Sequence, residues 1–255
     1  MGDEHLILEL GDVISLHNGV VPLYHSLGQL IRARIQSGEW HVGQRISSER
    51  DLMRMFGVSR TTVRQGIENL VKEGVLQRIR GKGTYVAPPK IKQGLLRLGD
   101  FADTMTRSGL IPSARLLGKG AVLPPLNIQQ ALHLGPAARV VWLQRLWLVN
   151  EFPMMIETLY LPAGRFSGLL IHYEIAKSLE AFIDSHYNIQ ITTETEVFEP
   201  VILESAEAQL LGVRSGFPAL WVEAIACDAY QRPMLVRNSL LRGDRCRFYV
   251  DLTLN

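Results

Sequence analysis

Residues 57–64 have the sequence Gly57-Val58-Ser59-Arg60-Thr61-Thr62-Val63-Arg64, and this stretch decides the fold of the first part of the chain. Ser59 has the residue type of a helix N-cap, and Gly74 that of a helix end. Between them, apolar residues follow the i, i+4, i+7, i+8 spacing of one buried helix face: Val63, Ile67, Leu70 and Val71. The stretch therefore predicts a helix that begins at Ser59, directly after a short turn.

A second helix is predicted just before this turn. Ser48 has the residue type of its N-cap, and Gly57 ends it. Only Gly57 and Val58 separate the two helices, which requires the sharp turn of a helix-turn-helix. Farther upstream, residues 23–37 carry apolar side chains at helical spacing, so we expect a third, amphipathic helix there.

Downstream of Gly74 the hydrophobic period changes from helical to strand-like. Residues 75–79 and 84–86 have the pattern of two strands, and the tip between them is rich in glycine and basic residues: Arg80-Gly81-Lys82-Gly83. This tip lacks the spacing of a nucleotide-binding phosphate loop and leads into a strand instead of a helix. Three helices followed by such a hairpin make a winged helix. Residues 88–94, which begin with two prolines, are predicted to form a linker.

The formal net charge of +2 hides a strong asymmetry along the chain. Residues 1–19 carry four acids and no Lys or Arg, residues 20–92 carry 13 Lys and Arg against 5 acids, and residues 93–255 carry 14 against 16. A short basic block beside a nearly neutral larger one is typical of a chain that binds a polyanion with one part. Because the block coincides with the predicted winged helix, it indicates nucleic acid as the partner.

The overall composition is that of a globular protein without a membrane span or secretion signal. Of the 255 residues, 47% are hydrophobic and 20% are charged, and no run of about 18 apolar residues occurs. The two cysteines, Cys227 and Cys246, suit a reducing compartment, so we expect a cytoplasmic protein with no membrane partner. The histidines have no metal-ligand spacing and no nucleophile motif occurs, so we expect no catalytic residue, metal or cofactor.

The polar face of the helix that begins at Ser59 carries groups that read DNA in other proteins. Four residues lie away from the apolar stripe in its first two turns: Arg60, Thr61, Thr62 and Arg64. Arginine bonds guanine O6 and N7 in a fork, threonine bonds phosphate or touches a thymine methyl, and the helix N-terminus favours a phosphate oxygen. The hairpin tip adds charge from Arg80 and Lys82, and its glycines allow close approach of the backbone to DNA. We therefore predict DNA contacts from both segments, including Gly81 and Gly83.

The remaining residues, 95–255, alternate strand-like segments with a few helices. Strands are expected at 140–149, 154–161, 194–203, 219–229, 234–241 and 247–252, and helices at 128–134, 178–187 and 205–211. Many strands with short connections and interspersed helices predict an α+β domain, built on an antiparallel sheet with flanking helices.

A series of ordered motifs runs through the first part of the chain. They are Pro22-Leu23-Tyr24, Ser37-Gly38-Glu39-Trp40, Gly43-Gln44-Arg45-Ile46-Ser47-Ser48-Glu49-Arg50, Gly57-Val58-Ser59-Arg60-Thr61-Thr62-Val63-Arg64, Glu73-Gly74-Val75-Leu76 and Gly81-Lys82-Gly83-Thr84-Tyr85-Val86. With them this segment resembles the winged-helix domain of GntR-type transcription regulators. The resemblance implies that the residues matching the family's DNA contacts touch DNA here: Arg50, Ser59, Arg60, Thr61, Thr62, Arg64 and Gly81. Ser47 departs from the family, which usually has proline at this position.

A second set of motifs spans nearly all of the remaining chain. They are Gly99-Asp100-Phe101, Leu143 to Arg145, Glu157-Thr158-Leu159-Tyr160-Leu161-Pro162, Ser178-Leu179 and Leu241-Arg242-Gly243-Asp244-Arg245. With them this part resembles the UTRA effector domain of the HutC branch of the GntR family. The resemblance implies a fold like that of chorismate lyase, used to sense a small molecule and to dimerise.

The resemblance also indicates where an effector would bind. In amino-sugar-phosphate sensors of this branch, arginines, serines, tyrosines and acids surround the effector, and this chain keeps three matching residues: Arg145, Glu157 and Ser178. Elsewhere the residue types have changed: Trp147 stands for the second arginine, Ala102 for a serine, Glu180 and Leu241 for tyrosines, and Leu235 for an acid. Because indole in place of guanidinium removes several charge-assisted donors, a phosphosugar is disfavoured.

The hypothesis for the effector is a carboxylate, or a partly apolar metabolite, that meets Arg145, with Arg237 as a second partner. Trp147 and Leu235 would then line the pocket. The alternative is that Trp147, Leu235 and Leu241 pack a core and that the pocket lies elsewhere, because apolar residues on strands are mostly core.

The function predicted is that of a sequence-specific bacterial transcription regulator, a repressor associated with the nucleoid when bound to its operator. A homodimer would place two recognition helices in successive major grooves of a palindromic double-stranded operator, and a small-molecule effector would modulate binding. The alternative is a lyase-like enzyme that docks on nucleic acid through its N-terminal domain. The predicted divisions are an N-terminal arm at 1–19, the winged helix-turn-helix domain at 20–87, the linker at 88–94 and the effector-binding and dimerisation domain at 95–255.

Overall fold

The computed structural model describes residues 21–79, 81–88, 91–94, 101–175 and 177–249. The chain divides into two compact units, Met1–Pro89 and Lys90–Asn255, and each is described by itself. The predicted N-terminal arm and Arg80 lie outside the described residues. Among the residues that are described, no helix is long and apolar enough to cross a membrane.

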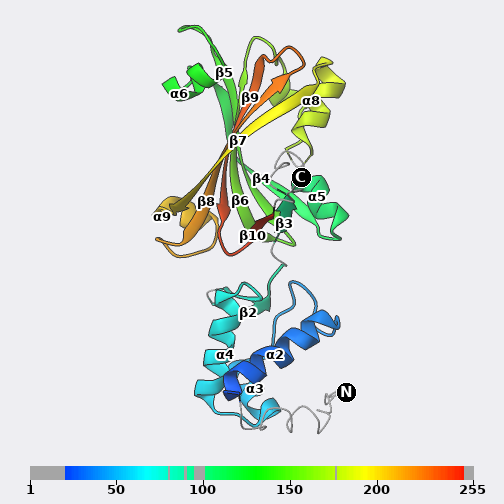
Figure 1. Cartoon of the computed structure of the whole chain (residues 1–255), viewed down its shortest axis with the longest axis vertical. Coiled ribbons are helices and arrows are strands. Elements are labelled where there is room, and N and C mark those ends of the chain that lie inside the picture. Colours follow the sequence, from blue (N-terminus) through cyan, green and yellow to red (C-terminus); the bar gives the residue numbers. More distant parts are fainter. Residues whose placement is uncertain (1–20, 80, 89–90, 95–100, 176, 250–255) are drawn as a thin grey trace, which may run out of the picture. The chain divides into compact units, whose positions relative to one another are not determined.

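The first unit contains the three predicted helices (Figure 1). They are α2 (Leu23–Gln36), α3 (Glu49–Phe56) and α4 (Arg60–Lys72). Ser48 caps α3, since its side chain accepts a hydrogen bond from the Asp51 backbone N–H, and Gly57 ends α3 in the left-handed conformation with φ of 63°. Gly66 lies where α4 crosses α2, and a Cβ added there would approach the Tyr24 carbonyl oxygen to 3.2 Å. The apolar faces meet in one core, whose largest members are Leu27, Ile31, Leu52, Phe56, Ile67, Leu70 and Leu76.

The wing is the antiparallel hairpin of β1 (Leu76–Ile79) and β2 (Gly83–Val86). Arg45 forms an isolated antiparallel bridge to Tyr85, so the segment before α3 lies along the outer edge of β2. Gly83 has φ of 125°, and a Cβ there would approach Arg45 Nε to 2.8 Å. Only glycine fits this position, because both the backbone conformation and the arginine exclude a side chain.

The second unit is built on a six-stranded antiparallel sheet with the order β4-β5-β6-β9-β8-β7. Its strands are β4 (Pro112–Val122), β5 (Val140–Val149), β6 (Phe152–Pro162), β7 (Ile191–Ile202), β8 (Pro218–Asp228) and β9 (Pro233–Arg242). The α+β architecture predicted from the sequence is confirmed, and five of these strands overlap the predicted ones. The predicted helices also form, as α6 (Leu126–Ala131), α8 (Leu179–Tyr187) and α9 (Ser205–Leu210).

Helices cover both faces of this sheet. On one face, α5 (Phe101–Arg107), α7 (Leu169–His172) and α8 pack against alternate residues of the strands, among them Leu143, Leu159 and Leu241. This face also carries Arg145, Glu157 and Arg237, whose charged side chains form an ionic network, and we call it the network face. On the opposite face, α6 and α9 pack at different places on the sheet, against separate apolar clusters. In Figure 1, α6 and α9 lie toward opposite ends of the sheet.

A separate pair of parallel strands joins the beginning and the end of the second unit. β3 (Ile91–Gly94) pairs with β10 (Cys246–Tyr249). The residues of β3 were predicted to lie in the linker, because the two prolines before them suggested an irregular connection. Pairing with a strand from the far end of the chain was not visible in local pattern. Within the described residues, Cys246 of β10 and Cys227 of β8 form no disulfide and both are partly buried, as their sparse use suggested.

Besides β3, three elements were not predicted: α5, α7 and β4. β4 is an edge strand that is mostly exposed, so it lacks the apolar alternation of a half-buried strand. It also contains Gly118 and Gly120, which argue against a strand in a sequence pattern. These glycines are required by packing, because a Cβ at Gly118 would lie 2.6 Å from the Trp142 ring of the neighbouring strand.

Candidate nucleic-acid interface and effector site

The helix α4 begins with an N-cap that leaves its first turn open to solvent. The Ser59 side chain accepts a hydrogen bond from the Thr62 backbone N–H at 3.2 Å, and its oxygen lies 2.9 Å from Thr62 Oγ1. Thr61 is exposed and Thr62 is half-buried. The remaining free N–H groups of the first turn and the positive end of the helix dipole favour an anion such as a phosphate oxygen.

Two guanidinium groups extend from the exposed side of α4. Arg60 is exposed and forms no hydrogen bond or ion pair with any described residue. Arg64 is also exposed, and its Nε lies 3.0 Å from Glu68 Oε1, one turn along the helix. Hydrogen bonding to Glu68 raises the pKa of Arg64 and lowers that of Glu68. An exposed pair of this kind is worth little, so Arg64 can leave Glu68 at small cost.

Further cations lie on α3 and on the wing. Arg50 in the first turn of α3 is exposed, as are Gly81 and Lys82 at the wing tip. Arg45 was not predicted as a contact. It is exposed, and its guanidinium lies against Gly83 at the tip of the wing. The signal that could have found it is its place in the family motif Gly43 to Arg50, just before α3. The structure thus places most of the described predicted DNA residues at exposed positions on α3, on α4 and at the wing, while Thr62 and Gly83 are half-buried.

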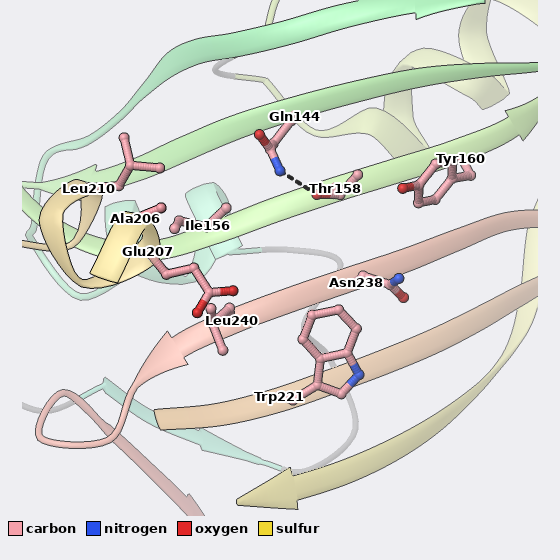
Figure 2. A pocket seen from close by; sticks show the side chains of 10 residues that line it. All are labelled: Gln144, Ile156, Thr158, Tyr160, Ala206, Glu207, Leu210, Trp221, Asn238 and Leu240. Carbon is pink, nitrogen blue, oxygen red and sulfur yellow. Dashed lines mark hydrogen bonds between the residues drawn. The ribbon is translucent and has the colours of Figure 1, made fainter. Parts of the chain in front are cut away.

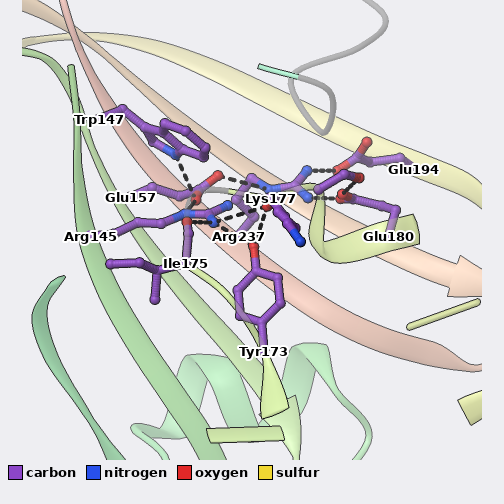
Figure 3. Close-up of polar contacts among 10 residues, drawn as sticks. Arg145, Trp147, Glu157, Tyr173, Ile175, Lys177, Glu180, Glu194 and Arg237 are labelled. Atoms are coloured by element: carbon purple, nitrogen blue, oxygen red, sulfur yellow. Dashed lines mark hydrogen bonds and ion pairs between the residues drawn. The ribbon is translucent and has the colours of Figure 1, made fainter. Parts of the chain in front are cut away.

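The second unit holds a buried ionic network on the network face of its sheet, shown in Figure 3. Arg145 of β5 and Glu157 of β6 are direct cross-strand partners, with Arg145 Nε 2.5 Å from Glu157 Oε2. Their side chains are only 3% and 2% exposed. Trp147 Nε1 donates to the same carboxylate oxygen at 3.1 Å, and the Arg145 guanidinium lies 4.3 Å from the centre of the Trp147 ring. Arg145, which the family pattern retains, and Trp147, which stands in place of its second arginine, therefore share one acceptor, Glu157 Oε2.

Arg145 also holds the loop that leads into α8. Its Nη1 donates to the Tyr173 hydroxyl and to the Ile175 carbonyl oxygen, both at 2.5 Å, and Tyr173 donates to the Lys177 carbonyl oxygen at 2.6 Å. Burial raises the pKa of Tyr173 to about 12, although the Arg145 charge opposes the shift. Arg145 Nη2 has no hydrogen-bond or ion-pair partner among the described residues. One end of this guanidinium is thus open to another acceptor.

Arg237 of β9 lies at the centre of the network and meets three carboxylates. Its Nε lies 3.3 Å from Glu157 Oε1, its Nη1 donates to Glu194 Oε1 of β7 at 2.6 Å, and its Nη2 donates to Glu180 Oε1 of α8. Figure 3 shows Arg237 between Glu157 on one side and Glu180 and Glu194 on the other. A buried guanidinium is tolerable because its charge is fully compensated.

The acids of the network respond to these charges differently. Burial opposes ionisation of Glu157, but Arg145 and Arg237 outweigh it and hold the pKa of Glu157 below its ordinary value. For Glu194, burial dominates over the attraction to Arg237 and raises the pKa above its ordinary value. Glu157 is therefore the fixed anion of the network, while Glu194 takes up a proton more readily than Glu157.

The other predicted effector residues have different surroundings. Ser178 is the N-cap of α8, with its side chain accepting from the Ala181 backbone N–H at 3.3 Å, and it lies 3.4 Å from Glu180 Oε2. Leu235 is fully buried in the apolar cluster under α7 and α8. Glu194 and Tyr173 were not predicted as site residues. Glu194, Glu196 and Phe198 alternate to one face of β7, and this pattern could have identified Glu194. The geometry thus gathers Arg145, Trp147, Glu157 and Arg237, with Ser178 at the edge.

A groove lies on the opposite face of the sheet (Figure 2). It is lined by Gln144, Ile156, Thr158, Tyr160, Ala206, Glu207, Leu210, Trp221, Asn238 and Leu240. Within it Gln144 Nε2 donates to Thr158 Oγ1 at 3.0 Å. The sheet separates this groove from the ionic network. Within the described part of the chain, no group of three or more His, Cys, Asp and Glu is arranged to hold a metal ion.

The two units together define a class of protein: a DNA-binding module, with exposed arginines on a capped recognition helix, joined to a sheet domain with a buried polar site. Residues 23–86 match the family described as "Bacterial regulatory proteins, gntR family", and residues 107–247 match the UTRA domain. The chain belongs to the GntR family of bacterial regulatory proteins and carries a UTRA domain.

Similar proteins cover nearly the whole chain. The transcriptional repressor NagR of Bacillus subtilis is 30% identical over 91% of this chain and 96% of its own length. The repressor PhnF of Mycolicibacterium smegmatis is 29% identical over 86% of this chain and 90% of its own. A crystal structure of PhnF from Mycobacterium smegmatis has a TM-score of 0.65 at 28% identity, and covers 90% of this chain and 99% of that one. The family and these relatives are transcription regulators and not enzymes, which decides against the lyase-like alternative.

Proposed function

We propose that this regulator is a repressor that reads a palindromic operator with α4 and responds to a small molecule bound at the ionic network. The observation that carries the first part is the open, capped N-terminal turn of α4, with Arg60 and Arg64 exposed beside it. That turn combines N–H donors for phosphate with guanidiniums for guanine. A DNA-binding regulator of this kind acts in the cytoplasm on the nucleoid.

The wing would contact DNA beside the recognition helix. Gly81 has φ of 75° and nothing within 4 Å of an added Cβ, so the tip backbone is bare. Lys82 at the same tip is exposed and positively charged. These features support phosphate or groove contacts, which position the protein and add affinity, while α4 contributes most of the sequence preference. Arg50 and Arg45 extend the same cationic surface within this unit.

For the effector, the support comes from Arg145. Its Nη2 has no partner among the described residues, beside the apolar ring of Trp147 and the phenol of Tyr173. A carboxylate or a partly apolar metabolite would use that donor and those rings. Arg145 also binds the carbonyl oxygen of Ile175, in the loop that leads into α8. A ligand at Arg145 would therefore change the contacts that hold the loop of residues 173–177. Through this loop, binding of the effector would change the conformation of the second unit.

The DNA-binding part of the proposal is tested by selection from random double-stranded DNA. We expect enrichment of a palindrome whose half-sites lie about 10 base pairs, or about 34 Å, apart, because a symmetric homodimer places its two recognition helices one helical turn apart. Affinity measured by fluorescence anisotropy should fall by tenfold or more between 50 and 200 mM salt. A single unpaired half-site would contradict the dimer, and the absence of any enriched sequence would contradict specific binding.

A further inference from the structure

The ionic network contains more negative than positive charge. Two guanidiniums, those of Arg145 and Arg237, face three carboxylates, those of Glu157, Glu180 and Glu194. Nη1 and Nη2 of Arg237 donate to Glu194 and Glu180, and its Nε lies 3.3 Å from Glu157 Oε1 as an ion pair without a hydrogen bond. With every carboxylate ionised, the network therefore carries a net charge of −1. A second anion next to Arg237 would meet this excess of like charge, so Arg237 is a poor receptor for a carboxylate or phosphate.

The excess charge is concentrated at the accessible edge of the network. The side chains of Arg237 and Glu157 are each 2% exposed, whereas those of Glu180 and Glu194 are 23% and 22% exposed. Each of these two acids gives one oxygen, Oε1, to Arg237. Glu194 Oε2 has no partner among the described residues, and Glu180 Oε2 has only a long contact of 3.4 Å with the Ser178 hydroxyl. Two acceptor oxygens from different elements, α8 and β7, thus remain for a ligand.

A second observation comes from the network face beside Glu157 and Arg237. Ser239 of β9 is directly opposite Glu157 of β6 in the strand register, and it is two residues from Arg237, so all three side chains are on the network face. Ser239 is 1% exposed, yet its Oγ has no hydrogen-bond partner among the described residues. Buried hydroxyls are nearly always satisfied, and one left open in a polar site indicates a missing partner.

We propose that the effector carries a cationic nitrogen, of the ammonium type, that binds between Glu180 and Glu194, with a further polar group of the same molecule reaching Ser239. This inference rests on the proposed effector site and narrows its ligand class. The ammonium group supplies three donors and one positive charge, which neutralises the network and satisfies the two open carboxylate oxygens. A carboxylate on the same molecule is compatible with Arg145 Nη2, so amino acids and related zwitterions fit both ends. Molecules whose only charge is negative do not.

The test uses three probes with the same five-carbon chain: cadaverine, 5-aminovalerate and glutarate. We expect saturating cadaverine or 5-aminovalerate to raise the melting temperature of the full-length protein by about 2 °C or more, and glutarate to leave it unchanged. The reason is that only the first two bring an ammonium group to Glu180 and Glu194. Greater stabilisation by glutarate, or no stabilisation by any of the three, overturns the proposal.

Variants locate the effect within the site. Glu180→Gln and Glu194→Gln should each raise the apparent Kd for the amine probes at least tenfold. Glu199→Gln, on the same strand as Glu194, should leave this Kd unchanged. Glu199 is exposed and alternates to the opposite face, so it is a matched control. Ser239→Ala removes a hydroxyl without a described partner, so the fold is retained, and the response should weaken. Equal responses in all four variants contradict the assignment.

A DNA-binding measurement in the same samples separates this inference from the proposed function. If glutarate stabilises the protein and alters operator binding, the ligand-responsive regulator stands and the ammonium site is wrong. If the amine probes bind as expected but no probe alters operator binding, the ammonium site stands and its proposed link to repression is wrong.

Discussion

Replacing Arg60 or Arg64 by alanine is expected to weaken operator binding roughly 5- to 150-fold for each arginine, corresponding to about 1–3 kcal/mol per specific guanine contact. Both residues are exposed in the first two turns of α4, so their removal leaves the core of the first unit intact. Arg64 must leave Glu68, but an exposed pair of this type is worth at most about 1 kcal/mol. The measurement is fluorescence anisotropy with the selected operator.

A matched control distinguishes contact from general charge. Arg214→Ala removes one positive charge from an exposed residue of the second unit, and should change the operator affinity less than twofold. The preference for operator over random DNA should also fall in Arg60→Ala and Arg64→Ala, because a contact to a base carries sequence information and a contact to phosphate does not. Undiminished affinity in both variants would mean that another segment reads the operator.

Replacing Glu157 by alanine is expected to destabilise the second unit by about 3–5 kcal/mol. Glu157 is the shared partner of Arg145, Arg237 and Trp147, all of which are buried with it. Its removal leaves Arg145 without its ion-pair partner and Trp147 Nε1 without its acceptor. The free energy of unfolding is measured by urea denaturation followed by tryptophan fluorescence. Glu199→Ala is the control and should change this free energy by less than about 0.5 kcal/mol, because Glu199 is exposed on the opposite face.

The same network gives a pH dependence with a definite sign. The pKa of Glu157 is lowered in the folded state from the ordinary value of 4.5, so its contribution to stability is present above that value. The contribution is lost as the pH falls through the folded-state pKa. The destabilisation caused by Glu157→Ala should therefore be largest near neutral pH and shrink in acid. A destabilisation that stays constant down to pH 3 would show that packing, and not the charge of Glu157, is responsible.

The helical part of the first unit was predictable because its signals are local. Ser48, Ser59 and Gly57 mark helix ends by the chemistry of single residues, and the predicted limits agree with the structure to within one or two residues. The bridge from Arg45 to the wing was not predictable, since it depends on a backbone pairing between distant segments. The motifs also led directly to the family, which the comparisons confirm.

The candidate effector site was only partly predictable. Arg145 and Glu157 were chosen by resemblance, and the hairpin of β5 and β6 explains why they meet, since their strands are adjacent in sequence. Arg237, Glu180 and Glu194 come from three separate elements, and only the order of strands β6-β9-β8-β7 and the packing of α8 bring them together. Arg237 was predicted as a second partner of the effector, whereas in the structure its guanidinium faces acids of the chain itself.

The central claim, that α4 reads base edges in two successive major grooves, is tested most directly by methylation interference on the selected operator. Methylation of guanine N7 blocks the fork that arginine makes in the major groove. We predict interference at guanines in two symmetric sets about 10 base pairs apart, with one guanine lost from each set when Arg64→Ala replaces the native protein. Binding that is indifferent to guanine N7 methylation, or an interference pattern identical in the native protein, Arg60→Ala and Arg64→Ala, would contradict the account.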